Sequence, residues 1–75
     1  MTTPTDICAE VTGTLWRILV QPQEPLLAGT AVAIIESMKM EIPIDAPTAG
    51  RVVEFLVAEG EAIEDGAVIA RFVAD

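Results

Sequence analysis

The chain has 75 residues, which allows one small domain, and 52% of them are hydrophobic against 21% charged. Twelve acidic residues oppose four basic ones, and the formal charge of −8 argues against binding to nucleic acid or to anionic membranes. No apolar run approaches the ~20 residues that a membrane-spanning helix needs. The composition indicates a small globular domain with a dense apolar core.

The N-terminal segment, residues 1–6, is predicted to be a flexible leader. It lacks the basic and apolar regions of a signal peptide, and the initial Met with so short a leader favours a free-standing protein. Cys8 is the one cysteine, so no internal disulfide can form, and we expect it to be a small buried hydrophobic residue. These features together favour the reducing environment of the cytoplasm.

The remaining sequence consists of two similar halves, related by a shift of 37 residues that places Gly13 on Gly50 and Gly29 on Gly66. Agreement over many positions in so short a chain predicts an internal structural repeat. The coinciding apolar positions are Leu15 with Val52, Ile18 with Phe55, Val20 with Val57, Leu26 with Ile63, Val32 with Ile69, and Ile35 with Phe72.

Both halves are predicted to be β-structure, because short runs of Val, Ile and Leu are broken by turn residues about every 8 to 12 positions. Prolines provide the turning residues over 21–25, and Gly60-Glu61 and Asp65-Gly66 do so in the second half. We expect the acidic residues of that second segment to be a solvated turn: Glu59, Glu61, Glu64 and Asp65.

Two local features predict irregular strands. Pro43 cannot donate to a β-ladder, which indicates an edge position or a bulge. The spacing of Val52, Phe55 and Val57 breaks strict alternation and predicts a bulge there. Trp16 is expected to pack against its strand neighbours, although an exposed contact residue is the alternative.

The two β units fit together most simply around a pseudo-two-fold axis, with one shared core. Residues 36 to 42 then form a hairpin that projects from one end, with Lys39, the only lysine of the chain, at its tip. Its neighbours Met38 and Met40 are interpreted as edge packing, as recognition residues that adapt to several surfaces, or as both at once, and Met38 is the firmer choice for recognition.

Glu36 and Glu41 flank this segment and are either solvated strand ends or recognition residues. Glu36 lies three residues before Lys39, where a modifying enzyme would sense its charge. Ser37 stands between Glu36 and Met38 and is grouped with the two glutamates as a candidate recognition residue.

The run Glu36-Ser37-Met38-Lys39-Met40-Glu41, followed by Ala46-Pro47-x-x-Gly50, resembles the biotinyl domain of biotin-dependent carboxylases over about Ala9 to Val73. The resemblance implies a single biotinyl/lipoyl-like domain over residues 1–75. It also implies an all-β barrel-sandwich hybrid, a flattened barrel of two four-stranded antiparallel sheets, with biotin joined by an amide to Lys39. Ser37 replaces the alanine most common in the motif, and Gln23-Glu24 replaces the usual Gly-Asp.

By this resemblance the chain is a biotin carboxyl carrier protein, served by a biotin protein ligase. It would shuttle a carboxyl group between the biotin carboxylase and carboxyltransferase subunits of an acyl-CoA carboxylase of the acetyl-CoA type. The chain itself is not expected to be an enzyme, because it has no His or Tyr and shows no catalytic triad or phosphate loop. No metal-ligand spacing is present either.

Two alternatives remain open. A lipoyl carrier domain of an oxidative multienzyme complex shares this architecture, although a lipoylated lysine usually follows Asp rather than Met. The other alternative is an unmodified interaction module, in which Lys39 is an ordinary exposed lysine.

Overall fold

The computed structural model describes residues 4–75, and within this range the chain forms seven β-strands and no helix. The molecule is elongated, at 38 × 17 × 17 Å. The strands are β1 (Thr5–Cys8), β2 (Gly13–Ile18), β3 (Ala31–Ser37), β4 (Met40–Asp45), β5 (Gly50–Phe55), β6 (Ala62–Ile63) and β7 (Val68–Ala74).

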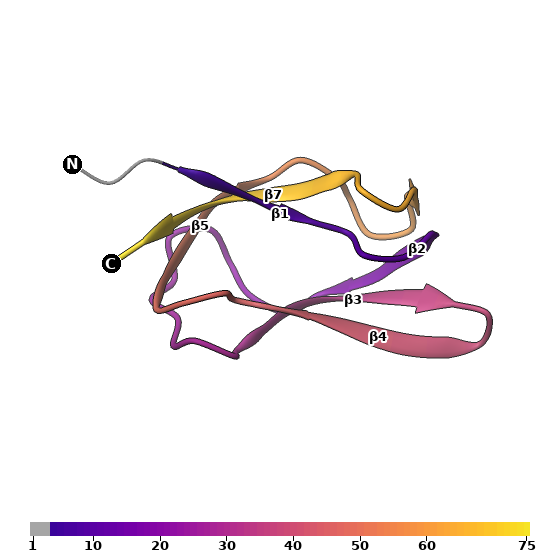
Figure 1. Cartoon of the computed structure of the whole chain (residues 1–75), viewed down its shortest axis with the longest axis horizontal. Helices are drawn as coiled ribbons and strands as arrows, with labels where there is room; N and C mark the ends of the chain where they lie inside the picture. The colour runs from indigo at the N-terminus through magenta and orange to yellow at the C-terminus, as the bar shows by residue number, and fades with distance from the viewer. Residues whose placement is uncertain (1–3) are drawn as a thin grey trace.

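The strands form two antiparallel sheets that enclose the core between them (Figure 1). The hairpin sheet has the order β4-β3-β2-β6, and the terminal sheet has the order β1-β7-β5. The all-β prediction is confirmed. One of the two expected four-stranded sheets has three strands, and the isolated bridge between Leu26 and Gly50 stands at the place of its fourth.

The predicted repeat is present in the backbone itself. The shift of 37 residues carries β2 onto β5 and β3 onto β7 with identical bounds. Hydrogen bonds obey the same shift, which relates Gln23 to Gly60 and Leu15 to Val52. The amide of Gly60 donates to the carbonyl of Leu15, and the amide of Gln23 donates to the carbonyl of Val52, both over 2.7 Å. The two halves are therefore related by a pseudo-two-fold axis.

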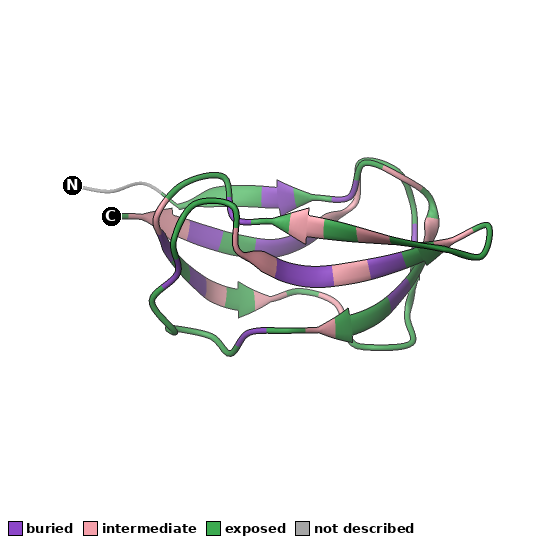
Figure 2. Cartoon of the chain, turned by 90° about the horizontal axis from the view of Figure 1, so that it is seen from below, coloured by how far each residue is buried: buried purple, intermediate pink, exposed green. Residues whose placement is uncertain are grey.

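The core follows the same symmetry. The six largest fully buried side chains form three pairs of repeat mates: Leu15 with Val52, Val32 with Ile69, and Ile35 with Phe72. Each burial of this kind contributes about 1.5–3 kcal/mol. Figure 2 shows buried residues along the strands of both sheets, whereas the end of the projecting hairpin is exposed. The sheets therefore supply stability, and the hairpin is free to serve another purpose.

The irregular strands appear where the sequence predicted them. The pairing of β5 with β7 shifts register between Val52 and Glu54, and that of β2 with β3 shifts between Leu15 and Arg17. Pro43 lies in β4, the edge strand of the hairpin sheet. The predicted bulge and the predicted edge position are both confirmed.

Three expectations need correction. Cys8 is exposed, because strand alternation turns Ile7 inward and Cys8 outward. Trp16 is 39% exposed, because Leu15 beside it points into the core. Residues 1–3 of the expected leader lie outside the described residues, whereas Thr5 and Asp6 belong to β1, where they pair with Phe72 and Arg71 of β7.

The acidic segment of the second half is exposed, as predicted, but two of its side chains have structural partners. The amide of Ile18 donates to Glu59 Oε2 over 2.8 Å, and the amide of Ala58 donates to Glu61 Oε1 over 3.1 Å. These carboxylates satisfy main-chain donors of a strand and a turn.

Candidate functional site

The candidate site is the turn that joins β3 to β4. Ser37 and Met40 form the last pair of the ladder, so Met38 and Lys39 alone make the connection. Both have positive φ angles, 52° and 66°, as in a type I′ turn. Such turns match the twist of the two strands but favour Asn and Gly, so a Met-Lys turn carries backbone strain.

The side chains of this turn point into solvent. Lys39 is exposed, Met38 is 92% exposed and Met40 is 63% exposed. The interpretation of Met38 and Met40 as edge packing is therefore wrong. Large exposed apolar side chains beside one amine provide a contact surface for a partner. The turn lies at the end of the molecule opposite the C-terminus (Figure 1).

Glu36 and Glu41 lie directly opposite each other on β3 and β4, and both are exposed. Like charges in this position are destabilising by roughly 0.2–1 kcal/mol. The hairpin therefore presents two adjacent carboxylates just behind the lysine. Both are solvated and lie one residue from the turn ends of their strands, because Ser37 and Met40 form one further pair of the ladder.

Ser37 ties the turn end of β3 to the segment just before β2, the neighbouring strand of the sheet. Its hydroxyl donates to the carbonyl of Thr12 over 2.8 Å, and the Thr12 hydroxyl accepts from the amide of Asp65 over 3.0 Å. This half-buried serine braces the hairpin from within, which the sequence argument did not foresee. The repeat held the only signal, because the mates of Ser37 and Thr12 are Ala74 and Ala49.

Gly13 lets this brace approach closely. A Cβ atom there would lie 2.3 Å from the carbonyl oxygen of Glu36 and 2.9 Å from Ile35 Cγ2. Only glycine therefore allows β2 to lie this close to the end of β3. Its mate Gly50 makes the same approach in the terminal sheet. A Cβ atom at Gly50 would lie 2.2 Å from the carbonyl oxygen of Val73.

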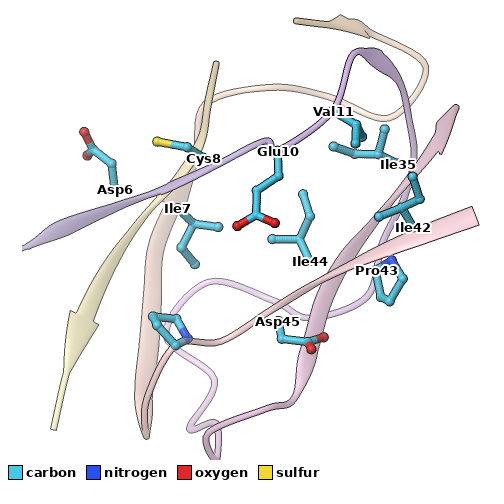
Figure 3. A pocket seen from close by; sticks show the side chains of 11 residues that line it. Asp6, Ile7, Cys8, Glu10, Val11, Ile35, Ile42, Pro43, Ile44 and Asp45 are labelled. Atoms are coloured by element: carbon cyan, nitrogen blue, oxygen red, sulfur yellow. The ribbon is translucent and has the colours of Figure 1, made fainter. Parts of the chain in front are cut away.

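A groove of about 350 Å³ lies between the edge strands β1 and β4 (Figure 3). It straddles the pseudo-two-fold axis, because its residues include the mates Ile7 and Ile44. Its lining includes Asp6, Asp45 and Glu10, whose carboxylate points into the space between the strands (Figure 3), and does not include the turn. Carboxylates and a proline on an edge strand also discourage pairing with other chains, so the groove needs no ligand to explain it.

Within residues 4–75, no group of three or more His, Cys, Asp or Glu side chains is arranged to hold a metal ion. The same part of the chain contains no helix of the length and apolarity that crossing a membrane requires. The turn itself offers one exposed primary amine, that of Lys39, which can be acylated.

Comparison with known proteins bears on what is attached. Residues 1–72 match the biotin/lipoyl family model described as "Biotin-requiring enzyme". The chain is 40% identical over 63 residues to the biotin/lipoyl attachment protein of Bacillus subtilis, covering 84% of this chain and 86% of that protein. It is 39% identical over 72 residues to the mitochondrial acetyl-CoA carboxylase of Saccharomyces cerevisiae, covering 96% of this chain but 3% of that protein.

A solved structure gives the same result. A single-chain, multi-domain long-chain acyl-CoA carboxylase superposes with a TM-score of 0.89 at 26% identity, over 96% of this chain and 7% of that one. The chain is thus similar to a small part of a large carboxylase and to nearly all of a small attachment protein. It belongs to the biotin/lipoyl family of attachment domains and is a biotinyl domain, with covalently bound biotin as its cofactor.

Proposed function

We propose that Lys39 is the attachment residue and that the chain is a non-catalytic carrier of biotin for a carboxylase. The observation that carries this proposal is the exposure of the only lysine of the chain on a strained two-residue turn. No other side chain offers an amine, so attachment at this turn meets no competition. The loaded group would project away from both sheets, which leaves the core undisturbed.

Attachment needs a partner, because a lysine amine is protonated at neutral pH and a poor nucleophile. A biotin protein ligase would supply biotinyl-adenylate and remove a proton from Lys39 Nζ. The nitrogen then attacks the acyl carbon, the bond from this carbon to the phosphate oxygen breaks, AMP leaves, and the nitrogen loses its second proton as the amide forms. Met38 and Met40 would contact the ligase through their exposed apolar surface, and Glu36 and Glu41 would contribute charge recognition.

The loaded chain would then work as a shuttle between a biotin carboxylase and a carboxyltransferase. Biotin supplies the atom that accepts and releases the carboxyl group. The protein contributes position: a rigid turn holds the arm at a high effective concentration near each active site. Because the carrier must leave after each half-reaction, the exposed methionines suit brief contacts with two different partners.

The carboxylase served is proposed to be of the acyl-CoA class, with acetyl-CoA as the acceptor type. The likeness to an acetyl-CoA carboxylase and to a long-chain acyl-CoA carboxylase supports this choice. A lipoyl carrier is the second candidate, since the Bacillus subtilis relative is described as a biotin/lipoyl attachment protein.

The test is the intact mass of the chain after co-expression with a biotin protein ligase. We expect one biotinyl addition, mapped to Lys39 by peptide sequencing, and none in the Lys39→Arg variant. The unmodified mass of the native chain would refute attachment, and a lipoyl increment in material from its own cells would favour the second candidate.

A further inference from the structure

The two halves contain equivalent bulges that carry different side chains. In β2 the extra residue is Trp16, followed by Arg17, and in β5 it is Val53, followed by Glu54. The backbone irregularity is the same in both, so the fold does not require Trp and Arg at this place. The half that carries Lys39 has an aromatic and basic pair where its mate has a small aliphatic and acidic pair.

Trp16 and Arg17 form a preorganised pair on the surface. The guanidinium carbon of Arg17 lies 5.0 Å from the centroid of the Trp16 ring, within the range of a cation–π contact. Trp16 is 39% exposed, and Arg17 is exposed as well. Trp and Arg are the residue types most enriched among those that dominate binding energy at protein interfaces. This pair also places a positive charge on a chain whose net charge is −8.

The pair is continuous with the hairpin. Arg17 lies opposite Ile34 of β3, and Ile34 lies opposite Pro43 of β4, so these three residues form one row across the sheet. The row of Ile35 and Ile42 follows towards the turn, and Glu36 and Glu41 form the row after it. Lys39 is five positions after Ile34 along the chain, so at the usual rise their Cα atoms lie at most about 17 Å apart. A partner that surrounds the hairpin over this length reaches the Trp16–Arg17 pair.

We propose that the Trp16–Arg17 pair is an anchor for the biotin protein ligase, which receives the indole in an apolar pocket with a carboxylate at its edge for Arg17. The argument for the ligase is the length of the arm. An unmodified lysine extends only about five bonds beyond its Cα, roughly 6 Å, so the turn itself must enter the cleft of the ligase. The biotinylated arm is about twice as long and lets a carboxylase act on it from further away.

This inference rests on the proposed attachment at Lys39, and its test separates the two. Initial rates of biotinylation are measured against carrier concentration with a purified biotin protein ligase. We expect Trp16→Ala to raise KM about tenfold with kcat unchanged, and Arg17→Ala to raise KM about threefold. Trp16→Phe should recover part of the loss. Failure of the native chain to accept biotin would refute the attachment proposal instead.

The repeat supplies matched controls, because Val53→Ala and Glu54→Ala alter the equivalent bulge of the other sheet. Both should leave KM within about twofold of the native value. An unchanged KM in Trp16→Ala, or equal effects in both halves, would overturn the anchor.

A second measurement does not depend on how the variants fold. The native carrier is labelled with 5-fluorotryptophan, which gives one fluorine resonance because Trp16 is the only Trp. Adding unlabelled ligase at a concentration that saturates binding should shift or broaden this resonance. A resonance that stays unchanged under these conditions would also overturn the proposal.

Discussion

The turn at Met38 and Lys39 should cost the protein stability, and replacing it with the sequence best suited to its backbone should recover that cost. The variant is Met38→Asn with Lys39→Gly, which gives the Asn-Gly pair preferred in type I′ turns. Both native residues have positive φ angles, which cost side chains of this kind about 1–2 kcal/mol each.

Two opposing terms reduce the gain. Glycine at position 39 raises the entropy of the unfolded chain, which costs roughly 0.5–1 kcal/mol. Asn retains part of the strain, although its short polar side chain tolerates this conformation better than Met. Loss of packing is negligible because Met38 is 92% exposed. The net expectation is a free energy of unfolding higher by about 1–2 kcal/mol, or a Tm higher by roughly 5–10 °C.

The assay is urea unfolding followed by far-UV circular dichroism, where a slope near 1 kcal/mol per molar predicts a midpoint higher by about 1–2 M. Met40→Gln is the matched control: Met40 is also exposed, but it lies in β4 and has no positive φ, so its replacement should leave the midpoint unchanged. Equal midpoints in the native and Asn-Gly chains would refute the account of strain. The gain would come with complete loss of biotin attachment, so the native turn exchanges stability for function.

Three further variants test the close approach of Gly50 to β7 and the support of the hairpin by Ser37. Gly50→Ala should lower the free energy of unfolding by about 2–3 kcal/mol, because the new Cβ would clash with the backbone of β7. Gly66 has a positive φ and open space around it, so Gly66→Ala should lower the free energy of unfolding by about 1 kcal/mol in the same urea assay. Similar losses at both positions would contradict the close-approach argument. Ser37→Ala removes the hydrogen bond to Thr12 and should cost about 0.5–1.5 kcal/mol, with faster amide exchange confined to residues 36 to 41. Unchanged exchange in that segment would show that the brace does not hold the hairpin.

Much of the fold could be predicted because apolar residues recur at equivalent positions of the two halves. Mates such as Leu15 and Val52, or Ile35 and Phe72, occupy one shared core and must be large and apolar in both halves. The position of Lys39 followed from the same repeat, since the segment between two paired units must connect them as a loop or hairpin. Long-range packing thus left a periodic signal in the sequence.

The errors concern the side of the strand on which a residue lies. Trp16 is large and apolar, so composition favoured burial, but it follows the buried Leu15 and is itself the extra residue of the bulge in β2, and its side chain lies at the surface. Gln23 is a different case: its φ is 71°, where its mate is Gly60. Its side-chain oxygen accepts a hydrogen bond from Arg51 Nε over 3.0 Å, which helps to offset the strain of the positive φ. No local sequence pattern predicts this contact.

The differences between the halves are informative because equivalent positions of the shared backbone place the same folding requirements on their side chains. Where a residue and its mate occupy equivalent positions but differ in chemistry, folding alone does not account for the difference. The Ser37 hydroxyl donates to the Thr12 carbonyl, whereas its mate Ala74 has no hydroxyl to donate. That pair and the Trp16–Arg17 pair lie in or beside the sheet that carries Lys39. The second half therefore acts as an internal control, against which the residues that prepare the first half for attachment can be identified.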